Sequence, residues 1–146
     1  MLRIAYRVFP LDSTRTGTPQ SDSFWLPVIP IRLVLGDRAV RVEGIVDSGS
    51  HCCLFHWDVG ELLGLDVGGG VRDTVSGALR STQSEVFYHR LRMDVGSERL
   101  SVRAGFTRDA LQPGLLGRDG FFDQFRVTFN PETTPAGMEI ERVRKV

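Results

Sequence analysis

The sequence predicts a mainly β fold: a small, closed, largely antiparallel barrel with one or two short helices. Short runs in which apolar and polar residues alternate recur along the chain, and turn residues such as Gly36-Asp37 and Gly96-Ser97 separate them. Helical periodicity is confined to one or two short segments. The length of 146 residues allows one domain with a hydrophobic core, so we expect a single domain over residues 1–146.

The first half of the chain is expected to hold one strand and then a hairpin. Apolar residues alternate over residues 2–8, which indicates a half-buried strand, whereas residues 13–23 are polar and aperiodic and indicate a surface loop. Alternation resumes over residues 28–35 and returns, after the Gly36-Asp37 turn, along a strand that runs straight into Asp47. We therefore expect Asp47 to lie at the end of a strand.

A short helix and further hairpins are expected in the middle of the chain. Apolar residues from Phe55 to Leu63 share one helical face, and Gly64 can end that helix. Gly68 to Gly70 indicate a mobile turn, and residues 74–82 indicate the tip of an exposed hairpin. Alternation over residues 87–95 and 100–106 predicts another hairpin.

The last third is expected to contain short elements only. Leu115 and the residues after it indicate a strand and then a short turn of helix through Phe122. Residues 125–129 alternate and predict a strand, and residues 138–146 predict a last, charged strand.

Composition and charge exclude several classes of protein. Apolar residues make up 41% of the chain and charged residues 25%, which is ordinary for a folded, soluble protein. Eighteen basic and eighteen acidic residues balance, so nucleic acid is not an expected partner. No apolar run approaches the roughly 18 residues of a membrane span, and the first residues do not resemble a signal peptide, so we expect a cytoplasmic protein without a membrane partner.

The tetrapeptide Asp47-Ser48-Gly49-Ser50 is the candidate for chemistry. It follows an apolar strand, Gly49 permits a close turn, and the hydroxyls of Ser48 and Ser50 can brace the loop. A single carboxylate is weak machinery for amide hydrolysis, whereas two facing carboxylates share a proton and act as base and acid. Because the Asp-Ser-Gly motif occurs once, the second carboxylate must come from another copy of the chain, across a two-fold axis.

Three segments in order resemble the retropepsins, the single-lobe aspartic peptidases of retroviruses and their cellular relatives. Residues 45–50 resemble the catalytic loop, the segment around Gly77 resembles the glycine-tipped flap, and residues 115–119 resemble the segment that supports the loop. Together with the strand that follows, the resemblance covers residues 26–131. It implies a barrel of the retropepsin (acid protease) type.

The resemblance also implies a role for each matched residue. Asp47 is implied to be catalytic, and the rest of the loop to support it and to bind substrate backbone. The implied activity is that of an aspartic endopeptidase, a homodimer that cleaves a peptide or protein substrate without metal or cofactor. The implied supporting residues are Ser48, Gly49 and Ser50 in the loop, Ser76, Gly77 and Ala78 in the flap, and Leu115, Leu116, Gly117 and Arg118 beneath the loop.

One departure from the family pattern concerns the edge of the loop. Viral retropepsins have an acidic residue where this chain has His51, so Arg118 lacks the partner that the pattern gives it. A second function therefore stays open: a non-catalytic module of the same fold that dimerises or binds peptides.

The residues His51, Cys52, Cys53 and His56 raise two further alternatives, a zinc site or a cysteine nucleophile. A zinc site usually needs a second, separated pair of ligands, which the sequence lacks, and small residues after a loop are more often core. The vicinal cysteines cannot form an ordinary structural disulfide, and we expect neither metal nor cofactor.

Overall fold

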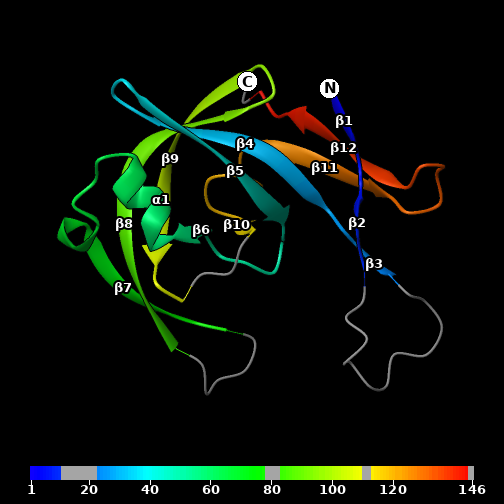
Figure 1. Cartoon of the computed structure of the whole chain (residues 1–146). Coiled ribbons are helices and arrows are strands. Elements are labelled where there is room, and N and C mark those ends of the chain that lie inside the picture. Colours follow the sequence, from blue (N-terminus) through cyan, green and yellow to red (C-terminus); the bar gives the residue numbers. More distant parts are fainter. Residues whose placement is uncertain (11–22, 78–82, 110–112, 145–146) are drawn as a thin grey trace.

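The chain is a single β-barrel flanked by a smaller sheet, as the computed structural model in Figure 1 shows. The structure describes residues 1–10, 23–77, 83–109 and 113–144. These residues include the helix α1 (Trp57–Leu62) and the 3-10 turn η1 (Val67–Gly69). The strands are β1 (Leu2–Ala5), β2 (Arg7–Pro10), β3 (Ser23–Leu26), β4 (Val28–Leu35), β5 (Arg38–Val46), β6 (Cys53–His56), β7 (Val71–Ser76), β8 (Gln83–Val95), β9 (Glu98–Thr107), β10 (Gly114–Leu116), β11 (Phe125–Asn130) and β12 (Gly137–Arg142).

The barrel closes through a second pairing of its first strand. The main sheet has the order β4-β5-β10-β6-β9-β8-β7, and β4 also pairs with β8, so the strands from β4 to β8 in that order form a ring. β7 pairs only with β8 and extends outside the ring. The predicted closed and largely antiparallel barrel is confirmed, although β10 runs parallel to β5 and β6 runs parallel to β9.

The chain ends form a separate sheet in which β12 lies between β1 and β11. The expected strand over residues 2–8 is in fact two strands that separate at Tyr6. The Tyr6 N–H bonds to the Ala136 carbonyl at 2.9 Å, and its ring packs edge-on against Trp25 with centroids 6.4 Å apart. After Tyr6 the chain leaves β12, and β2 pairs with β3, which the sequence did not predict. Residues 13–22 of the expected loop lie outside the described residues.

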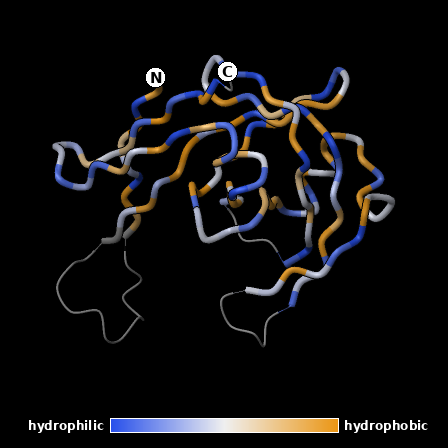
Figure 2. The backbone as a smooth tube through the Cα atoms, turned by 180° about the vertical axis from the view of Figure 1, so that it is seen from behind, coloured by the Kyte–Doolittle hydropathy of each residue, from blue (hydrophilic) through white to orange (hydrophobic). Residues whose placement is uncertain are grey.

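One hydrophobic core joins the barrel to the terminal sheet. Figure 2 shows hydrophobic and hydrophilic residues alternating along the strands, as a barrel with one buried face requires. Phe125, Met138 and Ile140 of the terminal sheet pack in the same cluster as Val95 and Leu100 of the barrel. The sheet of β1, β12 and β11 is thus held to the barrel by burial of apolar side chains.

The expected helix over Phe55 to Leu63 is shorter than its periodicity suggested. Phe55 belongs to β6 and is buried against Phe106, and α1 begins at Trp57, with the His56 Nδ1 accepting the Asp58 N–H at 3.1 Å. Gly60 lies so close to η1 that an added Cβ would be 2.7 Å from Val67 Cγ2.

No helix in the described part of the chain is long and apolar enough to cross a membrane.

Two other expected elements also differ from the structure. The glycines expected to form a mobile turn belong partly to η1, which ends at Gly69. The expected turn of helix through Phe122 is a run of turns, in which Phe122 N–H bonds to Gly117 O and Asp123 N–H to Arg118 O, each at 3.1 Å. The last strand is present as β12 and ends at Arg142.

Candidate active site

Asp47 follows the last residue of β5 and is fixed to β10 by its backbone. The Asp47 N–H donates to the Leu116 carbonyl at 3.0 Å, and the Ser50 N–H donates to the Asp47 carbonyl at 3.1 Å. The carboxylate is half-buried, and its Oδ1 accepts the Gly49 N–H at 2.9 Å. Among the described residues, no arginine or histidine pairs with this carboxylate. The loop thus presents a carboxylate with an oxygen still free to bind water or another carboxyl group.

Backbone contacts from residues 117–119 clamp the rest of the loop. The Arg118 N–H donates to Ser50 O at 2.9 Å, and the Asp119 N–H donates to His51 O at 2.8 Å. Gly117 lies directly against the loop, since an added Cβ would be 2.6 Å from Ser50 O and closer still to Cys52 O. Only a residue without a side chain fits there, which gives a physical reason for the glycine in the Leu115-Leu116-Gly117 segment.

The serines and the glycine of the loop take different positions. The Ser50 hydroxyl donates to Cys52 O at 2.8 Å, so Ser50 braces the loop internally. Ser48 and Gly49 are exposed at the tip of the loop. They are the part of the loop that a second molecule can reach.

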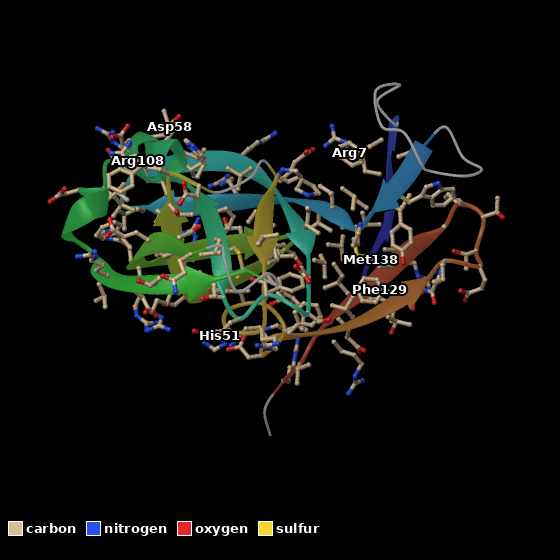
Figure 3. All side chains as sticks on the ribbon, turned by 90° about the horizontal axis from the view of Figure 1, so that it is seen from below. Arg7, His51, Asp58, Arg108, Phe129 and Met138 are labelled. Carbon is tan, nitrogen blue, oxygen red and sulfur yellow. The ribbon has the colours of Figure 1, made fainter. Side chains whose placement is uncertain are left out.

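Arg118 has a different partner from the acidic side chain of the family pattern. Its Nη1 donates to Ser48 O at 3.2 Å, so the guanidinium supports the loop through a backbone carbonyl. His51 is exposed at the edge of the molecule that Figure 3 shows, close to the loop. The neighbouring Asp119 forms an ion pair with Arg103 at 3.3 Å, and that guanidinium stacks over Tyr88, 4.5 Å from the ring centroid.

The hairpin of β7 and β8 lies beside the loop and carries the expected flap residues. In Figure 1 the hairpin extends below the barrel, on the side on which the chain leaves β5. Ser76 is the last residue of β7, Gly77 follows it and is exposed, and Ala78 lies outside the described residues. The base of the hairpin is fixed by a second apolar cluster, which consists of Cys52, Leu54, Val75, Val86 and Tyr88.

The two cysteines are buried in different places. Cys52 belongs to the cluster under the hairpin, where its Sγ accepts the Tyr88 hydroxyl at 3.2 Å, and Cys53 belongs to the main core. Burial raises the pKa of the Cys52 thiol and raises that of Cys53 to about 12. Neutral, buried thiols on opposite faces are poor nucleophiles and cannot converge on one ion, so neither alternative for these residues is supported.

A row of apolar side chains next to Asp47 was missed by the sequence reasoning. Leu115 lies opposite Ile45 of β5 on one side and opposite Leu54 of β6 on the other, and all three side chains are half-buried. Leu116, the next residue, is completely buried in the core. Because side chains alternate along a strand, Asp47 faces the same side as Ile45. The strand pattern of Leu115 and Leu116 could have predicted this, because adjacent strand residues point to opposite faces. Both leucines were expected to lie beneath the loop, but only Leu116 is in the core.

Comparisons with known proteins identify the fold. No protein-family model and no curated protein sequence matches the chain. Among solved structures, a retropepsin-like aspartic protease from Rickettsia conorii matches with a TM-score of 0.56 at 13% identity, covering 93% of this chain and 99% of that one. The inhibitor-bound EIAV protease matches with a TM-score of 0.49 at 12% identity, covering 64% and 82%. The chain therefore has the retropepsin-like fold of aspartic proteases.

Proposed function

We propose that the chain is an aspartic endopeptidase that acts as a homodimer. The observation that carries the proposal is the setting of the Asp47 carboxylate, which is half-exposed on a clamped loop at the end of β5. One of its oxygens is held by Gly49, and among the described residues the other has no hydrogen-bond partner. A mechanism with two carboxylates needs one such carboxylate from each subunit, fixed in place and not paired with a positive charge.

The second carboxylate is the Asp47 of a second copy. A two-fold axis beside the exposed loop tip brings the two identical loops face to face, because residues at such a contact meet their own copies. Two facing carboxylates cannot both ionise easily, so they share one proton. Ser48 and Gly49, exposed at the tip, are the residues that meet the partner loop.

Hydrolysis then follows from the shared proton. The ionised carboxylate takes a proton from a water molecule, whose oxygen attacks the carbonyl carbon, while the protonated carboxyl gives its proton to the carbonyl oxygen. The tetrahedral intermediate collapses when the amide nitrogen takes a proton from the pair, a hydroxyl of the intermediate returns a proton to the pair, and the carbon–nitrogen bond breaks. No metal or organic cofactor takes part in this scheme.

The substrate is an extended peptide with apolar side chains near the cleaved bond. The row of Ile45, Leu115 and Leu54 offers an apolar wall on the face of Asp47. The hairpin of β7 and β8 supplies a strand with which substrate backbone can pair, in the way that β-strand addition gives affinity. This hairpin closes over the peptide and excludes water.

Cleavage of a mixed peptide library between about pH 4 and 7 tests the proposal, because the pair must retain one proton. The wild type is compared with Asp47→Asn and with Asp37→Asn, a matched control in the turn at the far end of the β4–β5 hairpin. The solution mass of each is recorded. We expect dimeric wild type and Asp37→Asn to cleave, with fragments that begin or end at apolar residues, and dimeric Asp47→Asn to be inactive. Dimers that neither cleave nor bind pepstatin-type inhibitors, whose binding requires an intact pair of carboxylates, would instead support the non-catalytic peptide-binding module.

A further inference from the structure

The base of the β7–β8 hairpin is joined to the Asp47 loop through a buried hydrogen bond. The Tyr88 hydroxyl, on β8, donates to the Cys52 Sγ at 3.2 Å, and both side chains are buried. Cys52 lies just before β6, and its carbonyl accepts the Ser50 hydroxyl at 2.8 Å. Cys52 therefore contacts both the loop that carries Asp47 and the strand that carries the hairpin.

The strand beneath this hydrogen bond has a glycine at the point of contact. Gly105 of β9 pairs with Tyr88 on one side and with Leu54 on the other. A Cβ added to Gly105 would lie 2.7 Å from Leu54 Cδ2 and 2.5 Å from Val86 Cγ1, which leaves no room for a side chain. The apolar cluster under the hairpin can therefore pack directly on the barrel, where β6, β9 and β8 lie side by side (Figure 1).

A second connection joins the same two residues through charged side chains. The Arg103 guanidinium lies over the Tyr88 ring, 4.5 Å from its centroid, and its Nη2 pairs with an Asp119 carboxylate oxygen at 3.3 Å. The Asp119 backbone forms a parallel bridge with Cys52, and its N–H donates to His51 O at 2.8 Å. Contacts thus run from Cys52 through Tyr88, Arg103 and Asp119 back to Cys52, and we call these four residues the Tyr88 network.

The buried hydroxyl is the strongest contact of the Tyr88 network. The side chains of Arg103 and Asp119 are 46% and 42% exposed, and water screens an ion pair at such a position. The Tyr88 hydroxyl is shielded from water, and a buried hydroxyl that loses its partner is costly in free energy. Burial also raises the pKa of Tyr88, so the hydroxyl keeps its proton and donates over the pH range of the proposed reaction.

We propose that Tyr88 is a positioning residue of the peptidase, which acts through Cys52 to set the distance between the β7–β8 hairpin and Asp47. The inference rests on the proposed function, in which the substrate backbone lies between that hairpin and the carboxylate. A hairpin that is already held at the right distance does not have to be ordered when the peptide binds. Loss of the Tyr88 hydroxyl therefore weakens peptide binding and leaves the chemistry of the carboxylate pair unchanged.

Cleavage kinetics of Tyr88→Phe test this role. The substitution removes the hydroxyl and keeps the aromatic ring under Arg103. The substrate is a fluorogenic peptide with the sequence that the wild type cleaves fastest in the mixed library. We expect KM to rise about three- to tenfold, as the loss of one hydrogen bond allows, and kcat to stay within about twofold of the wild type. A purely structural role would reduce the amount of folded enzyme and so lower kcat without changing KM.

Two substitutions of Cys52 test whether it is the partner through which the hydroxyl acts. Cys52→Ala removes the acceptor and should raise KM as Tyr88→Phe does, whereas Cys52→Ser supplies a hydroxyl that can accept the same hydrogen bond and should keep KM near the wild-type value. The two increases should not add in the double variant of Cys52→Ala and Tyr88→Phe, because each substitution removes the same contact. Tyr6→Phe, a control at the only other tyrosine, lies outside the Tyr88 network and should leave KM unchanged.

Amide hydrogen exchange, measured without peptide, does not depend on cleavage. In Tyr88→Phe the amides that pair β7 with β8 should exchange about three- to tenfold faster than in the wild type, because the base of the hairpin has lost a fixed contact. The β4–β5 hairpin, which the Tyr88 network does not touch, should exchange at the wild-type rate. Circular dichroism checks that each variant is folded.

The proposal is wrong if Tyr88→Phe keeps the KM of the wild type, if kcat falls while KM stays the same, or if Cys52→Ser behaves as Cys52→Ala does. Cleavage with unchanged KM and unchanged exchange would refute the role of Tyr88 and leave the proposed function untouched. If no protein cleaves, the peptidase function is refuted, and exchange decides the rest: faster exchange at β7 shows that the Tyr88 hydroxyl fixes the hairpin, and unchanged exchange shows that it does not.

Discussion

Gly44 and Leu116 pack against each other next to the Asp47 loop, and this packing can be tested by exchanging volume between the two residues. Leu116 is completely buried, and a Cβ added to Gly44 would lie 2.6 Å from its Cγ and 2.9 Å from its Cδ1. Gly44 is the first residue of β5 that pairs with β10, and it is not among the glycines with a positive φ. The missing side chain of Gly44 is therefore explained by the space that Leu116 fills.

The structure gives a magnitude for each change. Leu116→Ala removes a fully buried side chain and should cost about 3 kcal/mol in the free energy of unfolding, within the usual range of about 2–5. Gly44→Ala forces a methyl group into an occupied space and should cost about 1–3 kcal/mol. In the double variant the new methyl group enters the space that the leucine has left. Its cost should fall below the sum of the single costs by about 1.5 kcal/mol or more.

Urea unfolding of the four proteins measures these costs, provided that the dependence on urea concentration is the same for all four. The midpoints then report stability alone. Costs that add within about 0.5 kcal/mol would refute the reasoning, because residues in direct contact should couple more strongly than that. A Gly44→Ala variant as stable as the wild type would refute it as well, since the methyl group would then have room beside Leu116.

Two further predictions concern the loop and the core. Arg118→Ala should lower the rate of peptide cleavage about tenfold, because the Ser48 carbonyl loses its hydrogen bond and the loop is less well fixed. The free energy of unfolding should change by less than about 0.5 kcal/mol, because the Arg118 side chain is exposed. The control Arg126→Ala, which removes an exposed arginine from β11, should change neither quantity. The second prediction concerns Cys53, whose pKa burial raises from 9.0 to about 12. Below pH 9 the thiol is neutral in both the folded and the unfolded chain. As the pH rises from 9 toward 12, only the unfolded chain loses the proton, so the free energy of unfolding falls. Between about pH 8 and 10 the free energy of unfolding of the wild type should therefore fall by about 1.4 kcal/mol more than that of Cys53→Ala. If the two free energies change with pH in the same way, burial does not raise the pKa of this thiol.

Strands in which apolar and polar residues alternate clearly could be predicted from the sequence. The hairpins of β4 with β5 and of β8 with β9 have glycine turns and one buried face, so local pattern and tertiary structure agree. The position of Asp47 at a strand end follows from the same pattern. The predicted fold class needed only such local signals.

Elements without a local signal of their own were missed or misplaced. β6 is four residues long and runs directly into α1, so Phe55 falls by coincidence on the helical repeat of Val59 and Leu62. β1 ends at Ala5 and β2 pairs with β3 instead, although the Tyr6 N–H still bonds to Ala136, a residue far away in the chain. Tertiary contacts of this kind leave no periodicity in a single sequence.

The site shows the same division. The sequence motifs singled out Asp47 and Gly117, and Gly117 lies too close to Ser50 O for any side chain. The motifs did not predict the partner of Arg118. An arginine has five donors and can bind a carbonyl as well as a carboxylate, so the loss of an acid at His51 did not leave the guanidinium without a contact. A missing partner in a family pattern is therefore weak grounds for expecting a broken loop.

The register of β10 against β5 determines how the candidate site is built. Its register against β5 places Leu115 on the face of Asp47 and Leu116 in the core, and a slip of one residue would exchange the two faces. The same register brings the Leu116 carbonyl to the Asp47 N–H and so holds the loop that carries the proposed catalytic residue.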